Sequence, residues 1–235
     1  MKVLVTGAFG NVGTYAVDEL LKRGIAVRCL DIPSPLSKKK ARAYRGRTEI
    51  IWGDIRDRDT VARAVTGVDA VAHLAFIIPP ASERRPAWAE TINVGGTWNL
   101  LQAALASPRK PRIVFTSSIA LYGRTQHLAP PRKADEVLHP YEDYAYHKMT
   151  CEQMIHAAGL PWVILRFGAV PPGQGAAQLE QARVGTVAAG TRLRGKGPPG
   201  GCGQFPRGFA ESQGDGVRGG SFADDPDGTG PDGVE

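Results

Sequence analysis

The sequence is poor in cysteine and has no long hydrophobic run. Its three cysteines, Cys29, Cys151 and Cys202, are odd in number and far apart, which excludes a disulfide framework and fits no zinc-site spacing. We therefore expect reduced thiols, no bound metal and a cytoplasmic location. No apolar run approaches the roughly 18 residues that a membrane span needs, and no signal peptide is recognisable at the start. We therefore expect no membrane partner.

The last part of the sequence lacks several residue types altogether. Residues 171–235 contain no tryptophan, tyrosine or isoleucine, yet they hold 17 of the 29 glycines. Such a segment cannot bury enough apolar surface to offset its ordering entropy. We predict one domain over residues 1–173 and a Gly/Pro/Asp-rich tail over 174–235, disordered from about residue 195, with at most a helix at 174–187. The tail is either an out-of-frame reading of a GC-rich gene or part of a truncated module.

Residues 1–170 alternate between predicted strands and helices. Several strands are continuous apolar runs, which is typical of a parallel sheet covered on both faces. The alternation predicts right-handed crossovers and a Rossmann-type, doubly wound parallel sheet of the α/β class. We expect strands at 2–6, 26–30, 48–52, 70–74, 112–116 and 162–166, and helices at 11–23, 57–65, 86–106 and 143–158.

The first predicted strand runs into a glycine-rich segment. Gly7 allows a tight turn, Gly10 allows the backbone to approach a pyrophosphate, and Gly13 allows the next helix to pack closely on the sheet. The free N–H groups and the dipole at the start of that helix then bind phosphate. In this strand–helix context the spacing predicts a dinucleotide site. Its candidate residues are Gly7, Phe9, Gly10, Asn11, Val12 and Gly13.

Asp31 ends the second predicted strand and bears on the choice of cofactor. A carboxylate there accepts hydrogen bonds from the adenosine ribose and repels a 2′-phosphate, which favours NAD over NADP. A basic stretch over residues 38–47, expected in a loop, favours a phosphate instead. We give Asp31 more weight because the strand end fixes its position. The basic stretch matches no nucleic-acid motif, so we expect no nucleic-acid partner, and DNA binding is the weakest alternative.

A tyrosine and a lysine lie four residues apart at the start of a predicted helix. Tyr144 and Lys148 therefore share a helix face. A neighbouring ammonium lowers the pKa of a phenol, so Tyr144 can exchange a proton with a substrate hydroxyl or carbonyl during hydride transfer. Ser118, just past the fifth strand, would orient the substrate oxygen, with Ser117 as the near alternative.

Together these segments resemble the short-chain dehydrogenase/reductase family, in particular its extended, epimerase/dehydratase-like members. The resemblance selects Ser118 over Ser117 and implies a homodimer through helices at 93–106 and 143–158. It also implies further contacts between the chain and its cofactor. These are made by Asp54, Ile55, Leu74, Ala75, Asn93, Tyr144 and Lys148.

The resemblance covers about residues 1–173 and carries the functional hypotheses. It implies an NAD-dependent oxidoreductase or epimerase/dehydratase that acts on a nucleotide sugar or a similar hydroxylated small molecule. Ala169 stands where extended members have an asparagine, and after residue 173 the usual C-terminal substrate domain is largely missing. The alternative is therefore a non-catalytic NAD-binding module or an inactive truncated relative.

Overall fold

The computed structural model describes residues 1–124, 127, 132–168, 170 and 187–192, the last of these by their backbone alone. All of them lie in the first of two compact units, Met1–Gly197. The helix expected at 174–187 lies outside the described residues up to 186, and so does the disorder expected from about 195. Within the described part of the chain, no helix is long and apolar enough to cross a membrane.

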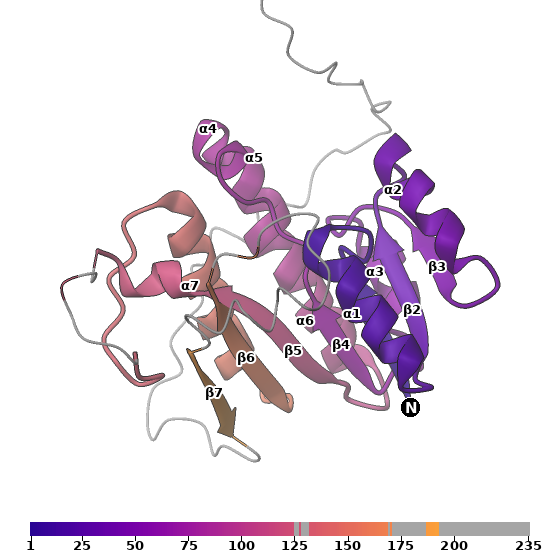
Figure 1. The fold of residues 1–235 in the computed structure, drawn as a ribbon. Coiled ribbons are helices and arrows are strands. Elements are labelled where there is room, and N and C mark those ends of the chain that lie inside the picture. Colours follow the sequence, from indigo (N-terminus) through magenta and orange to yellow (C-terminus); the bar gives the residue numbers. More distant parts are fainter. Residues whose placement is uncertain (125–126, 128–131, 169, 171–186, 193–235) are drawn as a thin grey trace, which may run out of the picture. The chain divides into compact units, whose positions relative to one another are not determined.

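Seven strands form one sheet in the order β3-β2-β1-β4-β5-β6-β7 (Figure 1). The first six pair in parallel, and β7 is antiparallel to β6. This arrangement confirms the predicted doubly wound sheet. The strand β7 extends it by one strand that the sequence pattern does not predict. The strands are β1 (Lys2–Thr6), β2 (Ala26–Asp31), β3 (Glu49–Trp52), β4 (Ala70–His73), β5 (Arg112–Ser118), β6 (Trp162–Phe167) and β7 (Val187–Arg192).

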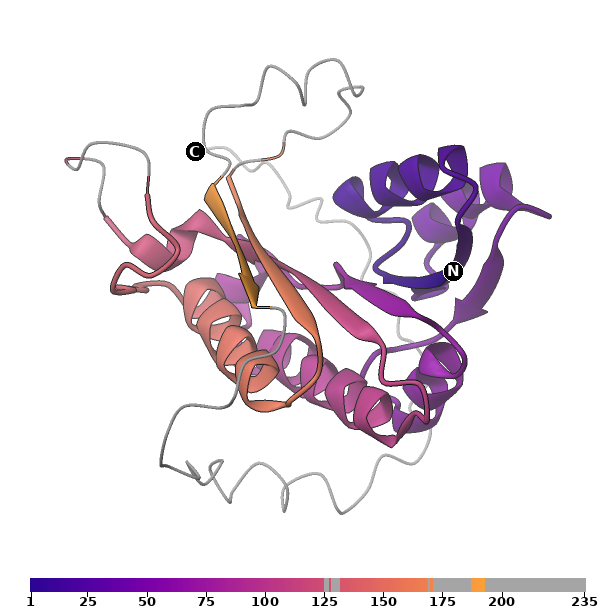
Figure 2. The ribbon, with the colours of Figure 1, turned by 90° about the horizontal axis from the view of Figure 1, so that it is seen from below.

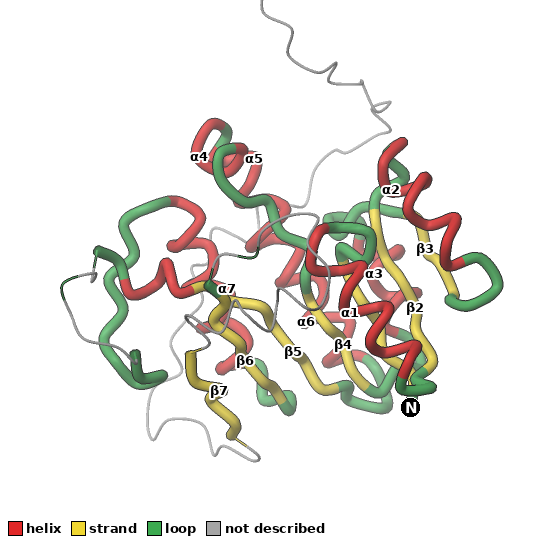
Figure 3. Tube along the Cα trace, in the orientation of Figure 1, coloured by secondary structure: helices red, strands yellow, loops and turns green. Residues whose placement is uncertain are grey.

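Helices cover both faces of the sheet (Figure 2). The helices α1 and α2 lie on one face, and α3, α6 and α7 lie on the other. The strand order reverses between β1 and β4, which is where open α/β sheets bind ligands at the carboxyl ends of their strands (Figure 3). The helices are α1 (Asn11–Lys22), α2 (Pro35–Ala41), η1 (Arg42–Tyr44), α3 (Arg58–Val65), α4 (Ala81–Arg84), α5 (Pro86–Glu90), η2 (Thr91–Gly95), α6 (Gly96–Ala106), η3 (Ile119–Tyr122) and α7 (Asp143–Ala157).

The expected loop over residues 38–47 is largely wrong. Lys38 to Lys40 lie in the helix α2, and Arg42 begins the short helix η1. The hydroxyl of Ser34 caps α2 by accepting a hydrogen bond from the Ser37 N–H at 3.1 Å. Pro35 occupies the first helical position, where its fixed φ and missing N–H are favourable. Ser34 followed by Pro35 is therefore a helix-start signal that can be read from the sequence itself.

The long helix expected at 86–106 is divided into three pieces. These pieces are α5, the π-helical turn η2 and α6, which follow one another without a gap. The short helix α4 lies before residue 86 and is not one of them. A side chain at Gly96 would place its Cβ 2.4 Å from the Ile55 Cγ2 atom, so the glycine permits α6 to pack on the segment after β3. The remaining predicted elements agree with the structure within two residues at each end.

A buried ion pair joins β6 to α7. Arg166 donates from Nη2 and Nε to the two carboxylate oxygens of Glu152, at 2.7 and 3.0 Å. Both side chains are at most one-tenth exposed. The Nη1 atom of Arg166 also donates to the Tyr122 hydroxyl at 2.9 Å. The pair therefore ties the last parallel strand to the helix that carries Tyr144.

Candidate active site

The glycine loop is shaped by close backbone contacts. Gly7 has φ +65° and donates its N–H to the Leu30 carbonyl at 2.9 Å. A Cβ at Gly7 would lie 2.8 Å from the Ala75 backbone, and one at Gly13 would lie 2.1 Å from the Gly7 carbonyl oxygen. Real Cβ atoms do not approach backbone so closely. Gly7 and Gly13 therefore exclude any side chain.

The helix α1 starts without a side-chain cap. Gly10 is its N-cap residue, and no side chain accepts a hydrogen bond from the first turn. Asn11 donates from Nδ2 to the Val170 carbonyl at 3.2 Å, so its amide is directed away from that role. Val12 and Asn11 are partly exposed, whereas Gly13 is buried. The uncapped N–H groups and the helix dipole fit a pyrophosphate, and so the residues present fit a dinucleotide.

Phe9 supports the loop from inside the core. Its ring is 2% exposed and lies 5.9 Å from the Tyr44 ring and 5.4 Å from the Trp52 ring, measured between centroids. Only the backbone of Phe9 faces the loop surface. A cofactor contact at this position is therefore a prediction for the main chain alone.

Asp31 lies at the end of β2 against the same loop. Its Oδ2 atom accepts a hydrogen bond from the Phe9 N–H at 2.7 Å, and its Oδ1 atom accepts from the Ile32 N–H at 2.8 Å. Lys40 of α2 donates to the Phe9 carbonyl at 3.0 Å. Burial raises the pKa of Asp31 and outweighs the opposing hydrogen bonds and the Lys40 charge. The Oδ2 atom keeps a second lone pair, with which it can accept from a ribose hydroxyl.

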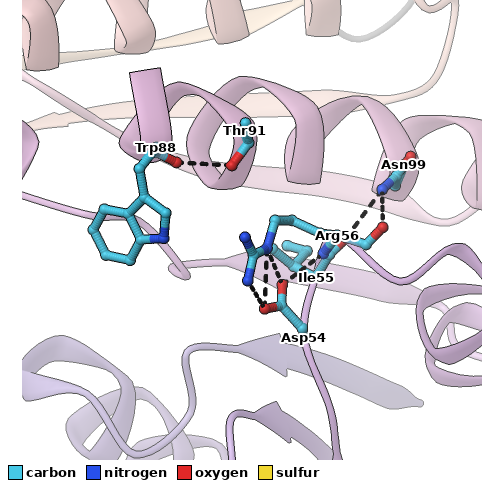
Figure 4. A network of polar contacts seen from close by, with 6 residues as sticks. All are labelled: Asp54, Ile55, Arg56, Trp88, Thr91 and Asn99. Atoms are coloured by element: carbon cyan, nitrogen blue, oxygen red, sulfur yellow. Dashed lines mark hydrogen bonds and ion pairs between the residues drawn. The ribbon is translucent and has the colours of Figure 1, made fainter. Parts of the chain in front are cut away.

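Asp54 and Ile55 lie in the segment after β3 (Figure 4). Arg56 donates to both carboxylate oxygens of Asp54, from Nε at 3.0 Å and from Nη2 at 2.6 Å. Asn99 reaches from α6 and donates to the carbonyls of Ile55 and Arg56 at 3.3 and 2.9 Å. The predicted cofactor contact at Asp54 is therefore a carboxylate already paired with Arg56, a charged neighbour that sequence reasoning did not include.

A chain of buried hydrogen bonds holds Leu74 and Ala75. Their N–H groups both donate to the Thr6 hydroxyl at 3.2 Å, and that hydroxyl lies 2.8 Å from the His73 Nδ1 atom. The His73 Nε2 atom lies 2.9 Å from the Thr97 hydroxyl, which itself donates to a backbone carbonyl. His73 therefore donates from Nε2 and accepts at Nδ1. Burial lowers its pKa to about 3, so His73 stays neutral and structural.

Asn93 binds the chain beside Leu74 and Ala75. Its Oδ1 atom accepts from the Ile77 N–H at 2.7 Å, and its Nδ2 atom donates to the Ile77 carbonyl at 3.0 Å. The side chain is fully buried. Both ends of its amide therefore bond to protein backbone. Asn93 would thus act on the cofactor indirectly, through the segment around Ile77 that it holds.

Ser118 and Tyr144 meet at the carboxyl end of β5. The Ser118 hydroxyl accepts a hydrogen bond from the Ala120 N–H at 3.1 Å and is also hydrogen-bonded to the Tyr144 side chain. The Ser117 hydroxyl is buried and has no hydrogen-bond partner among the described residues, which favours Ser118 of the two. Burial raises the pKa of Tyr144, and the Ser118 hydrogen bond opposes this in part. Lys148 does not lower the pKa of Tyr144 here, although the sequence predicts that it should.

Lys148 is buried beneath Tyr144, which explains that difference. Its Nζ atom donates to the Thr116 carbonyl at 2.5 Å and lies 3.5 Å from the centroid of the Phe76 ring. The same atom is 5.8 Å from the centroid of the Tyr144 ring. Burial lowers the pKa of Lys148 to about 7, against the opposing charge of Glu152. The ammonium is therefore directed at Thr116 and Phe76 rather than at the phenol oxygen.

Glu83 is a neighbour of the site that sequence reasoning missed. Its carboxylate oxygens accept hydrogen bonds from the Asp143 N–H at 3.1 Å and the Tyr144 N–H at 3.0 Å. Glu83 thus caps α7 from α4 and fixes the residue that carries the phenol. The two segments are 60 residues apart, so no local pattern announces the contact.

The sequence is similar to enzymes of one family. A family model described as the NAD dependent epimerase/dehydratase family matches residues 3–184. A UDP-glucose 4-epimerase of Lactobacillus helveticus is 34% identical over 174 residues, which are 71% of this chain and 51% of the relative. A 3 beta-hydroxysteroid dehydrogenase/Delta 5-->4-isomerase of Mycobacterium tuberculosis is 36% identical over 167 residues, which are 66% of this chain and 42% of the relative.

Solved structures show the same similarity. A UDP-glucose 4-epimerase from Brucella ovis in complex with NAD has a TM-score of 0.60 and 29% identity, and the match covers 70% of this chain and 51% of the other. A short-chain dehydrogenase/reductase superfamily protein from Agrobacterium tumefaciens with bound NAD has a TM-score of 0.58 and 31% identity, covering 71% and 49%. The chain spans about half the length of these relatives. With the fold and the glycine loop, these matches show that the chain belongs to the NAD-dependent epimerase/dehydratase family of the short-chain dehydrogenase/reductase superfamily.

Proposed function

We propose that this chain carries the cofactor site and the proton-transfer residues of an NAD-dependent oxidoreductase or epimerase/dehydratase. Its substrate would be a nucleotide sugar or a similar hydroxylated small molecule. The observation that carries the proposal is the contact between Ser118 and Tyr144, with Lys148 one helical turn further along, at the carboxyl end of the sheet. The glycine loop lies at the same end, after β1.

The roles of the three residues follow from their positions. Bound NAD supplies a nicotinamide that exchanges hydride with the substrate carbon. Ser118 orients the substrate oxygen, and Tyr144 gives or takes the proton at its phenol oxygen. Lys148, one helical turn after Tyr144, is buried with its Nζ atom donating to the Thr116 carbonyl, and it would tune Tyr144 through its charge rather than by direct contact. Asp31 accepts from the adenosine ribose and favours NAD over NADP.

The test is the Tyr144→Phe variant. Turnover should fall by roughly 10²- to 10⁴-fold because the proton donor is gone, whereas the NAD dissociation constant should stay within about twofold. Tyr146→Phe is the matched control, since Tyr146 lies on the same helix and is 48% exposed. Unchanged turnover in Tyr144→Phe would refute the assignment. NAD binding without turnover of any sugar nucleotide or hydroxysteroid would favour the non-catalytic module.

We propose further that the cofactor domain proper ends near residue 173 and that residues 174–235 are a tail, from which β7 (Val187–Arg192) pairs with β6 at the edge of the sheet. The change in composition at this point supports the boundary. Resequencing the coding DNA across codons 165–180 tests the tail. A shifted frame that restores strands and helices would show that the tail is an out-of-frame reading, and an unchanged frame would favour the truncated module.

We also propose a homodimer and a cytoplasmic location. The helices α6 and α7 contact each other and would pair with their copies in a partner chain. Light scattering on the purified chain measures the dimer. Substitution of an exposed α7 residue such as Tyr146 by glutamate should weaken the dimer if this face forms it. The buried, free thiols of Cys29 and Cys151 support the reducing compartment.

A further inference from the structure

His147 lies between the two proposed catalytic residues of α7, and the mechanism does not use it. Its side chain is 7% exposed, and its Nδ1 atom lies 3.3 Å from the Asn93 Nδ2 atom. It therefore contacts the side chain that binds Ile77.

The orientation of Asn93 determines which atom faces His147. The Ile77 N–H can only donate and the Ile77 carbonyl can only accept, so Asn93 must present Oδ1 to the first and Nδ2 to the second. The amide cannot be reversed without losing both bonds. Its Nδ2 group is a donor only, and so the His147 Nδ1 atom must carry a lone pair rather than a proton.

The segment held by Asn93 leads directly to the catalytic residues. Thr6 holds it at residues 74 and 75, and Asn93 holds it at Ile77. Phe76 lies between these two points. Its ring is 3.5 Å from the Lys148 Nζ atom and meets the Tyr144 ring edge-on, with centroids 5.7 Å apart.

We propose that His147 is a positioning residue: its neutral imidazole accepts a hydrogen bond from Asn93 and so holds residues 74–77 against Lys148 and Tyr144, and its protonation releases that segment. The proposal rests on the proposed function, because the released segment includes the predicted cofactor contacts at Leu74 and Ala75.

The charged groups around His147 set the balance between its two states. Glu83 of α4, Glu90 of α5 and Asp143 of α7 favour the protonated ring, and Lys148 follows it on α7 with its ammonium bound to Thr116. Burial outweighs the three carboxylates, so the pKa of His147 is lowered from its ordinary value. The neutral ring therefore persists at neutral pH and is lost on acidification.

The direct test is an NMR titration of the full chain. We expect the neutral His147 ring to carry its proton on Nε2, and the amide resonances of residues 74–77 to shift as His147 titrates. The Asn93→Asp variant replaces the donor by an acceptor and should raise the His147 titration midpoint. A proton on Nδ1 at neutral pH, or amides that do not follow the titration, would overturn the proposal whether or not the chain binds NAD.

The second test compares NAD affinity across pH in two matched variants. In the wild type, protonation of His147 should weaken NAD binding roughly tenfold, the loss of about one hydrogen bond. His147→Asn keeps an acceptor near the Nδ1 position but does not titrate, so its affinity should lack this weakening. His156→Asn is the control, because His156 lies on the same helix as His147 but its ring packs at a tilt against Trp162 of β6, with centroids 4.4 Å apart. Equal acid weakening in wild type and His147→Asn would overturn the inference, whereas no NAD binding at any pH would refute the proposed function instead.

Discussion

The region around β1 and β2 is shaped by backbone contacts, whereas the region around β4, β5 and α7 is shaped by buried polar side chains. In the first region, Gly7 and Gly13 lie so close to other backbone that a Cβ at either position would be less than 3 Å from a backbone atom. In the second, His73, Asn93, Lys148 and Glu152 are all buried and all hydrogen-bonded. The first region should therefore respond to added volume, and the second to lost partners and to pH.

The largest effect should come from breaking the buried ion pair of the second region. Arg166→Met leaves Glu152 buried without its partner, and this should lower the free energy of unfolding by about 3–5 kcal/mol. Urea denaturation measures it. The double variant Arg166→Met with Glu152→Leu removes both charges and should recover most of the loss. A single variant as stable as the wild type would contradict this account of the second region.

A smaller loss should follow from adding one methyl group to the first region. In Gly13→Ala the Cβ would overlap the Gly7 carbonyl oxygen, so the loop must move. We expect the free energy of unfolding to fall by about 3 kcal/mol and NAD binding to be lost. Calorimetric titration and urea denaturation measure both. Gly10→Ala is the matched control, because its Cβ would lie 3.1 Å from the same oxygen and a small shift relieves it. Equal losses in the two variants would show that the contact distance is irrelevant.

The pH dependence of stability should separate the two regions further. His73 is neutral when folded, with a pKa of about 3, but takes up a proton when unfolded near its ordinary value of 6.5. Its contribution is therefore complete above pH 6.5 and declines as the pH falls. Between pH 6.5 and 5 the loss should be about 2 kcal/mol. In His73→Gln the slope of the unfolding free energy against pH should correspond to about one proton fewer taken up on unfolding over this window. An unchanged slope would show that His73 is not the titrating group.

The smallest effect concerns the choice of cofactor in the first region. Asp31→Ser removes the carboxylate that would repel a 2′-phosphate and leaves Lys40 nearby. The ratio of NADP to NAD affinity should rise by about tenfold, or about 1.4 kcal/mol. Fluorescence titration with both dinucleotides measures the ratio. Asp18→Ser, at an acidic position on α1, serves as the control for net charge. A ratio that stays constant in Asp31→Ser would remove the argument for NAD from this residue.

The two regions also differ in how far the sequence predicts them. The glycine loop and Asp31 follow local rules, namely a strand end, a glycine spacing and a helix start, and the structure has them in that arrangement. The helical spacing predicts Tyr144 and Lys148, and the family resemblance selects Ser118. In contrast, the contacts of Asn93 with Ile77 and of His73 with Thr6 join distant segments, and only the folded sheet brings them together. The raised pKa of Tyr144 was unpredictable for the same reason, because burial depends on tertiary packing.

The cap that Glu83 provides makes the first turn of α7 dependent on a distant segment of the chain. The glycine loop closes on neighbours within β1, β2 and the segment after β4, whereas the first turn of α7 is completed by a side chain 60 residues earlier in the chain. The backbone of Tyr144 therefore relies on Glu83 of α4, whereas the glycine loop is shaped by contacts with Leu30, Leu74 and Ala75. The part of the site around Tyr144 thus depends on a segment distant in the sequence, which the glycine loop at the start of α1 does not require for its own contacts.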